Sequence, residues 1–325
     1  MRVPWFFLVL VAIASAQSPI PQVPPKDAVR IREFYRLAPR IAGEVWPQWE
    51  ETPAPLLLVT NENEFLTHYP NPPAAFKNIA DDNYVRPRQF SPSFLATFPA
   101  LGSSQSVIVI GEAENTAAKT STPWVITLMH EHFHQLQDGQ PGLLHAVNGL
   151  GLAHGDQTGM WMLNYPFPYD KPELNRSFVE LRDALLAALN EPDDGKFRPL
   201  ARRYVTARKQ FYAQLSADDA KYLSFQLWKE GIARYVQVKS AEAAASYEPA
   251  SEYTALSDYE SFKSYAARAR ADTLFELKQA DLAKWQRVVV YSFGASEGFL
   301  LDRLNPGWRE GYFRHLFTLD PYFDK

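Results

Sequence analysis

A histidine-rich segment, TLMHEHFHQLQ at residues 127–137, carries residue types that could do chemistry. His130, Glu131 and His134 have the spacing H-E-x-x-H, in a chain of 325 residues with seven histidines. On a helix, residues four positions apart lie one turn apart on the same side. Two such imidazoles can bind one zinc ion, each at about 2.0–2.1 Å. Glu131 lies beside them, where its carboxylate could take a proton from a water molecule that the ion activates.

The residues around this motif predict the helix that must carry it. Thr122 is a good N-cap and Pro123 a good first helical residue. The apolar residues that follow recur at helical spacing and predict a face directed to the core: Ile126, Met129, Phe133 and Leu136. His132 lies about 180° round this helix from the other two histidines. It therefore cannot bind the same ion, and we interpret it as a supporting or packing residue.

A catalytic zinc site needs a third protein ligand, with the fourth position left for water. Histidine candidates are His68, His145, His154 and His315, and the ligand could also be a carboxylate. Glu230 stands out because it lies beside the apolar face of a predicted helix, in FQLWKEGIARYVQV (225–238). A carboxylate beside a buried face is costly unless it is paired, and a metal is a good partner. The alternative is a surface ion pair with Arg234, one turn further on. Spacing alone leaves both interpretations open.

The segments TLMHEHFHQLQ and WKEGIARY together resemble the gluzincins, zinc metallopeptidases with two His ligands from H-E-x-x-H and a Glu ligand from a later helix. The resemblance covers residues 104–137, 222–238 and 286–317, less than a third of the chain. It implies a zincin-like fold, one Zn²⁺ per chain held by His130, His134 and Glu230, and Glu131 as general base and acid. The segment WKEGIARY differs from the family pattern at Arg234. Members of the family often have at this position an Asp that orients the first His ligand.

Two further segments are similar to the aminopeptidase branch of the gluzincins. YSFGASEGFLLDRL (291–304) resembles that branch's Tyr-x-x-Gly segment, which implies that the hydroxyl of Tyr291 supports the oxyanion of the tetrahedral intermediate. GEAEN (111–115) resembles the branch's G-x-M-E-N strand, with Ala113 in place of Met. This implies Glu114 as a binder of a substrate's free amine. That branch also has a large N-terminal β domain, for which the residues before the motif leave little room. Without the resemblance, Tyr291 could be a core tyrosine and Glu114 a solvated acid at a strand end.

The segment 291–304 also permits a serine hydrolase. Residues 294–298, Gly-Ala-Ser-Glu-Gly, satisfy G-x-S-x-G, between a possible strand (RVVVYSF) and a predicted helix. Ser296 would be the nucleophile, and Asp302 and His315 follow in the order of a triad. Both lie on predicted helices, however, and few residues remain for the strands that usually carry these partners.

A third possibility is a non-catalytic zincin-like protein that binds a partner. Glu131 argues against a purely structural zinc site, because such a site needs no carboxylate base. A structural site also usually fills its fourth position with Cys or His. The chain has no cysteine, and His132 faces away from the other two histidines. We therefore expect a zinc-dependent hydrolase, most simply a peptidase acting on a peptide or protein substrate.

The elements around the motif predict an α+β fold. A small N-terminal sheet lobe (17–117) with a mixed sheet precedes a larger helical lobe (118–325). SPIPQVPPKD (18–27) predicts an extended arm, residues 55–60 and 106–114 predict strands, and 159–170 predicts an aromatic loop that packs in the core. Helices are predicted at 122–137, 173–190, 197–216, 218–240, 257–281 and 307–317, with a helix or strand-to-helix passage at 286–304.

The N-terminus predicts the cellular location. Residues 1–16 combine Arg2, an apolar run and Ala14-Ser15-Ala16, which is typical of a cleavable signal peptide. We therefore expect export to a periplasmic or extracellular location. The apolar run is far shorter than the ~20 residues of a membrane-spanning helix, and no later segment approaches that length. The formal charge of −4 with interspersed signs argues against nucleic acid or an anionic membrane as partner. The oligomeric state is open.

Overall fold

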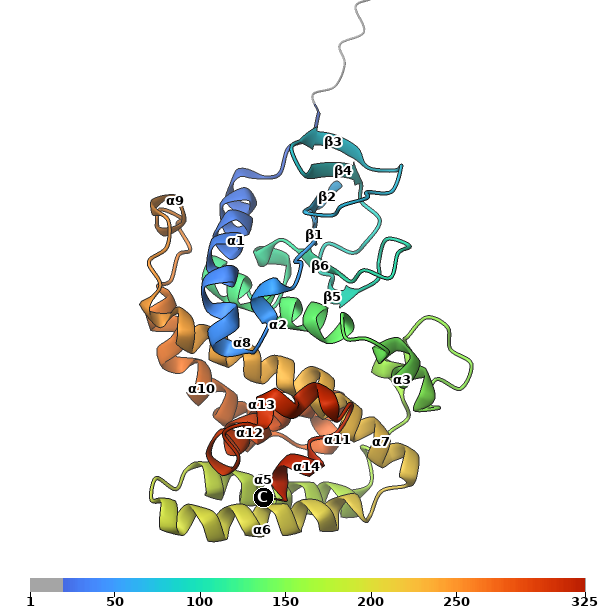
Figure 1. Ribbon diagram of the computed structural model, residues 1–325, viewed down its shortest axis with the longest axis vertical. Helices are drawn as coiled ribbons and strands as arrows, with labels where there is room; N and C mark the ends of the chain where they lie inside the picture. The colour runs from blue at the N-terminus through green and yellow to red at the C-terminus, as the bar shows by residue number, and fades with distance from the viewer. Residues whose placement is uncertain (1–19, 325) are drawn as a thin grey trace, which may run out of the picture.

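The computed structural model describes residues 20–324, so the predicted signal peptide lies outside the described residues. The architecture is α+β, as predicted: a six-stranded mixed sheet occupies the N-terminal part, and the C-terminal part is mostly helical (Figure 1). In Figure 1 the sheet lies above and the helices below, and the helix that carries the histidine motif runs between them.

The sheet has the strand order β3-β4-β2-β1-β6-β5. Its strands are β1 (Leu56–Val59), β2 (Asn63–Thr67), β3 (Lys77–Ala80), β4 (Asn83–Pro87), β5 (Leu95–Phe98) and β6 (Val107–Gly111). The neighbouring strands β1 and β6 are parallel, and every other pair is antiparallel. These two strands are fully buried and are the two that their apolar runs predicted. β6 ends at Gly111, however, and Ala113–Asn115 form a 3₁₀ turn (η2), so the predicted strand is too long.

The N-terminal part also contains a long helix, α1 (Pro25–Val45), where the sequence predicted an extended arm. The arm prediction is wrong from Pro25 onwards, because Pro25 occupies the first helical turn, where its missing N–H costs nothing. Apolar residues then recur at helical spacing and are buried, among them Phe34, Leu37 and Ile41. A 3₁₀ turn, η1 (Trp49–Glu51), connects α1 towards the sheet.

Helix α2 (Ser121–Asp138) packs on one face of the sheet near β5 and β6, and contacts α1 as well. The sheet residues on this face belong to the main core: Leu56, Leu58, Ile108 and Ile110. The opposite face has a smaller core that includes Leu57, Val59, Val107 and Val109, with Phe90, Phe94 and Phe98 packed against it. α2 begins slightly earlier than predicted, with Thr120 at the N-cap. Thr122 donates instead to the carbonyl of Glu260, at 2.5 Å.

The C-terminal part consists of helices around a continuation of the same core. Its longer helices are α5 (Pro172–Leu189), α6 (Asp194–Tyr212), α7 (Ala217–Gln226), α8 (Ile232–Ala243), α10 (Phe262–Gln279) and α12 (Val289–Leu304). Shorter ones are α3 (Leu143–Gly149), α4 (Trp161–Asn164), α9 (Ser251–Thr254), α11 (Leu282–Trp285), α13 (Trp308–Gly311) and α14 (Asp320–Phe323), with 3₁₀ turns η4 (Ala244–Ser246), η5 (Gln286–Val288) and η6 (Tyr312–Arg314). The single helix predicted at 307–317 is therefore two short pieces. The aromatic segment 159–170 packs as predicted, with Trp161, Tyr165 and Phe167 buried.

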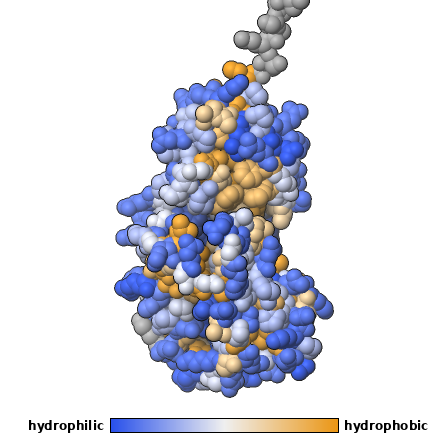
Figure 2. All heavy atoms as spheres, turned by 90° about the vertical axis from the view of Figure 1, so that its right-hand side faces the viewer, coloured by the Kyte–Doolittle hydropathy of each residue, from blue (hydrophilic) through white to orange (hydrophobic). Residues whose placement is uncertain are grey.

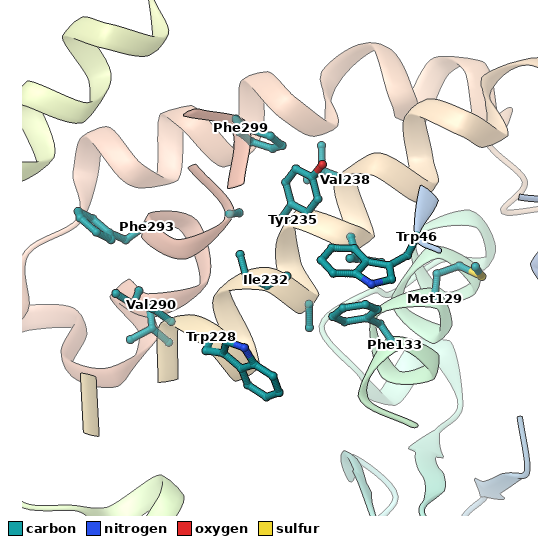
Figure 3. Close-up of a cluster of buried hydrophobic side chains, with 14 of the residues drawn as sticks. Trp46, Met129, Phe133, Trp228, Ile232, Tyr235, Val238, Val290, Phe293 and Phe299 are labelled. Atoms are coloured by element: carbon teal, nitrogen blue, oxygen red, sulfur yellow. The ribbon is translucent and has the colours of Figure 1, made fainter. Parts of the chain in front are cut away.

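The predicted helix 218–240 is interrupted by a π-helical turn, η3 (Leu227–Gly231), between α7 and α8. At its end Gly231 lies directly against Gly294 of α12: a Cβ added to Gly231 would be 2.6 Å from the Cα of Gly294. Figure 3 shows how Trp228 and Ile232 from this region lie between α12 on one side and Trp46 and Phe133 on the other. The π turn thus lies between α12 and α2.

The surface seen from the side on which α3 projects is mostly hydrophilic (Figure 2). Apolar atoms gather on the upper, sheet-containing part and around the narrower middle of the molecule. Exposed apolar side chains include Leu144 of α3 and Met160 and Leu163 around α4. Within residues 20–324, no helix is both long and apolar enough to cross a membrane.

Candidate metal site

Three side chains from two distant segments converge between the two parts of the molecule. His130 and His134 come from α2, and Glu230 comes from the π turn η3. One potential ligand atom from each lies within 4.8 Å of the other two. The Nε2 atoms of the two histidines are 3.2 Å apart, and an oxygen of Glu230 is 3.9 Å from His130 Nε2 and 3.5 Å from His134 Nε2. The three groups therefore point at a common centre and could hold a metal ion.

These separations suit a tetrahedral ion. Two ligand atoms that each lie ~2.0–2.1 Å from one tetrahedral zinc ion are ~3.3 Å apart, close to the spacing of the two imidazole nitrogens and of His134 and Glu230. Two imidazoles and one carboxylate form the ligand set of an open zinc site. Both histidines are buried, and the side chain of Glu230 is 20% exposed. The residues present therefore fit the ion that the motif implies.

The electrostatics of the three groups are tightly coupled. Burial would raise the pKa of Glu230, but the adjacent His134 and His130 outweigh it and hold that pKa well below its ordinary value. Burial lowers the pKa of His130, whereas the carboxylate of Glu230 outweighs burial at His134 and raises its pKa. Without a metal, Glu230 is thus ionised and stabilises a proton on His134. A cation bound by the three groups would compete with that proton.

Gln137 fixes the orientation of His134. Its Oε1 atom lies 2.7 Å from His134 Nδ1, while its amide nitrogen donates to the carbonyl of Lys229 (3.1 Å) and to the hydroxyl of Tyr312 (2.8 Å). Because the amide group of Gln137 is used as a donor, its oxygen accepts the proton of His134 Nδ1. In the neutral imidazole this leaves Nε2 without a proton and directed at the centre, as a metal ligand requires. The Nδ1 atom of His130 has no hydrogen-bond partner among the described residues.

Glu131 is buried next to the cluster and held by the edge strand of the sheet. Thr97 of β5 donates a hydrogen bond to its carboxylate at 2.8 Å and contacts its carbonyl oxygen at 3.1 Å. This contact fixes one carboxylate oxygen. His132, by contrast, lies on the other side of α2 as expected, with its Nε2 atom 3.0 Å from the carbonyl of Thr52 and its ring against Trp49.

The structure also brings Tyr291 to the cluster. Its ring centre is 6.2 Å from that of His130, and its hydroxyl accepts a hydrogen bond from Arg287 at 3.1 Å. Burial, aided by the charge of Glu230, raises the pKa of Tyr291, so the hydroxyl stays protonated at neutral pH and can donate. The sequence did not single out Arg287, Thr97 or Gln137. Only Gln137 and Arg287 gave a local signal, since each lies one turn from a predicted site residue.

Glu114 is not brought to the cluster. It lies on η2 and accepts hydrogen bonds from Arg30 (2.7 and 2.9 Å) and Lys26 (2.7 Å). Arg30 also contacts Ser121 at the start of α2, nine residues before His130, a distance of roughly 13 Å along the helix. The bond from Arg30 lowers the pKa of Glu114 to about 2. Its carboxylate is thus already paired within the chain.

The other candidates for the third ligand are not part of the cluster either. Among residues 20–324, the group that could hold a metal contains only His130, His134 and Glu230, and not His68, His145, His154 or His315. The alternative pairing of Glu230 with Arg234 is also absent, because Arg234 forms an ion pair with Glu276 at 3.0 Å.

The structure does not have the strand and sharp turn that a serine nucleophile at Ser296 would need before it. Residues 289–304 form one continuous helix, α12, so no strand and no sharp turn precede Ser296. Ser296 is fully buried, and its hydroxyl has no hydrogen-bond partner among the described residues. Asp302, the proposed triad acid, accepts instead from the hydroxyl of Tyr235 at 2.8 Å.

Comparison of this chain with models of known families, with curated proteins and with solved structures finds no match. The gluzincin resemblance therefore rests on the motif residues themselves.

Proposed function

We propose that the protein is a zinc-dependent metallohydrolase of gluzincin type that cleaves peptide bonds. The observation that carries the proposal is the convergence of His130, His134 and Glu230, with the carboxylate of Glu131 buried beside them. Each of these residues has the chemical type and the approximate spacing that a zinc site with a neighbouring base requires.

Each residue of the site has a separate role in the proposed reaction. His130, His134 and Glu230 would hold Zn²⁺, which when bound polarises a carbonyl group and lowers the pKa of a water molecule towards about 7. Glu131, oriented by Thr97, accepts the proton of the attacking water and passes it to the leaving amine. Tyr291 donates a hydrogen bond to the oxygen on which negative charge develops.

The position of β5 supports a peptide as substrate. Within the described residues it is the last strand of the sheet, and it lies next to α2 (Figure 1). An edge strand presents unpaired backbone groups that can bind an extended peptide by strand addition. Since Thr97 of β5 contacts Glu131, a peptide bound along this edge would pass close to the base.

Export is part of the proposal and rests on residues 1–16, with their basic start, apolar run and Ala-Ser-Ala end. A mature, secreted enzyme without cysteines would not depend on disulfides for its stability.

Substitution of the base tests the function. The zinc-loaded mature protein should hydrolyse members of a peptide library, and Glu131→Gln should lower the rate by roughly 10²–10⁴-fold while zinc stays bound. His145→Gln, an exposed histidine outside the cluster, serves as the control and should keep the wild-type rate. A Glu131→Gln variant with the wild-type rate would remove the proposed mechanism. Bound zinc without hydrolysis of any peptide would favour a non-catalytic binding protein.

A further inference from the structure

Arg287 is a half-buried cation beside the cluster with no carboxylate partner. The arginines that are buried in the described part of the chain, Arg30, Arg86 and Arg208, each form an ion pair. In residues 20–324, no carboxylate oxygen lies within the 4.0 Å of an ion pair from the guanidinium of Arg287. A partly desolvated charge without a counter-ion is costly. An anionic ligand bound at this position would offset that cost.

The hydrogen-bond partners of Arg287 are neutral and leave part of its donor set unused. One terminal nitrogen donates to Gln226 Oε1 at 3.3 Å, and the other donates to the hydroxyl of Tyr291 at 3.1 Å. Gln226 is itself fixed by a hydrogen bond to the carbonyl of Met162 at 2.5 Å. A guanidinium has five N–H donors in a planar fork. The remaining donors are therefore available, on a side chain that its two partners hold in place.

Arg287 lies close to the reacting centre. Tyr291, whose hydroxyl it contacts, has its ring centre 6.2 Å from that of His130. One residue of an extended peptide spans about 3.5 Å. A carboxylate one or two residues beyond the scissile bond would thus be within reach of the guanidinium.

The charge balance of the site also favours an anionic ligand. The carboxylates of Glu131 and Glu230 together offset the charge of a divalent ion, and Lys229 is paired with Asp138. Arg287 remains as the uncompensated charge. Burial would lower its pKa, but Tyr291 and Glu230 raise it, so the group stays cationic.

We propose that Arg287 determines specificity by binding a carboxylate of the substrate, so that the enzyme releases fragments of one or two residues from free C-termini. A planar guanidinium binds a carboxylate through two parallel hydrogen bonds, which a carboxamide cannot match. The same recognition could be met by the side chain of an Asp or Glu near the cleaved bond. The inference rests on the proposed peptidase function.

Three sets of N-acetylated peptides test it: a free C-terminal carboxylate, the same sequences as carboxamides, and carboxamides that end in Glu. Wild type should prefer the free acids in kcat/KM by roughly 10- to 100-fold, the contribution of a charged hydrogen bond. Arg287→Gln should abolish that preference, because kcat/KM falls far more for the free acids than for the carboxamides. Arg287→Lys should retain part of it, and Arg203→Gln, an exposed arginine of α6, should behave as wild type.

The outcomes separate the possible roles. If only the free acids are preferred, the group that Arg287 binds is the C-terminal carboxylate. If the carboxamides that end in Glu are preferred equally, the group that Arg287 binds is a side-chain carboxylate. If Arg287→Gln lowers kcat for free acids and carboxamides alike, Arg287 acts through Tyr291 on the reaction itself, and the inference is overturned.

A binding measurement separates this inference from the proposed function. Calorimetry should detect binding of the free acids to the zinc-loaded Glu131→Gln protein. The same measurement on the Glu131→Gln, Arg287→Gln double variant should detect no binding. Equal hydrolysis of acids and carboxamides by wild type would overturn the role of Arg287 and leave the peptidase standing. Absence of zinc, or of any hydrolysis, would instead overturn the peptidase.

Discussion

Four polar residues within one stretch of α2 divide into two sets because of helix geometry alone. His130 and His134 point with Glu131 towards Glu230 and β5, whereas His132 contacts Thr52 and Trp49 on the other side of α2. Such local geometry follows from the 3.6-residue repeat, which is why the sequence alone predicted which histidines could share an ion.

Gln137 is expected to set the strength of metal binding through His134. Gln137→Leu would remove the acceptor of the His134 Nδ1 proton and leave that group unpaired in a buried position. Loss of such a partner typically weakens metal binding by about 10–100-fold. Zinc dissociation constants from competition with a chelator would measure the effect.

Gln140→Leu is a matched control, because Gln140 lies just beyond the same end of α2 and its side-chain amide donates to the carbonyl of Leu136, not to a site residue. It should bind zinc as wild type does. Equal affinities for the Gln137 and Gln140 variants would mean that Gln137 does not support the ligand.

Glu230 was the site residue that local reasoning left undecided. Its pairing with Arg234 or with the histidines depends on which elements pack together, and the π turn at Leu227–Gly231 is not visible in the sequence pattern. The resemblance to gluzincins, not the spacing, favoured the ligand role. Thr97 was missed for the same reason, since its relevance depends on a contact between elements distant in sequence. Arg287 was missed although its partner Tyr291 lies only one turn further along the chain.

At the scale of elements, the contact of Gly231 with Gly294 positions the π turn between α12 and α2. Gly231→Ala would place a Cβ 2.6 Å from the Cα of Gly294 and 2.9 Å from the carbonyl oxygen of Val290. Because both neighbours are backbone, the helices must move apart. Overpacking of this kind costs about 1–3 kcal/mol in the free energy of unfolding. Denaturant unfolding of the zinc-free protein would measure it.

Gly149→Ala provides the comparison, because a Cβ at this helical position has no neighbour within 4 Å. It should be neutral or slightly stabilising. A Gly231→Ala protein as stable as the Gly149→Ala protein would show that the close approach of η3 and α12 is not required.

The elements themselves were predictable where their patterns are strong. α2 and α5 have the predicted limits within one or two residues, because their apolar repeats are continuous. α1 was missed because it begins at the second of two consecutive prolines, and Pro39 interrupts the pattern on its exposed side. β3, β4 and β5 are only partly buried, and β2 is mostly buried but combines polar and apolar residues (NEFLT), so none of the four has the continuous apolar run that identified β1 and β6.

For the whole molecule, the site lies where the two parts meet. The main core runs without a break from the sheet through α1 and α2 into the C-terminal helices. Arg30 strengthens this junction by joining α1 to Glu114, to Ser121 of α2 and to Asp258. The sequence predicted the fold class and the order of the two parts. The strand order was not predictable, because strand neighbours are set by long-range pairing.

Metal content tests the central claim most directly. Mass spectrometry of the purified mature protein should find about one zinc per chain in wild type and in the exposed-histidine control His145→Gln, but little in Glu230→Ala. That result would assign Glu230 as the third ligand, because only the fold brings it to the histidines. Full zinc content in Glu230→Ala would contradict the ligand set. No zinc in wild type, even after zinc is supplied, would contradict the metal site itself.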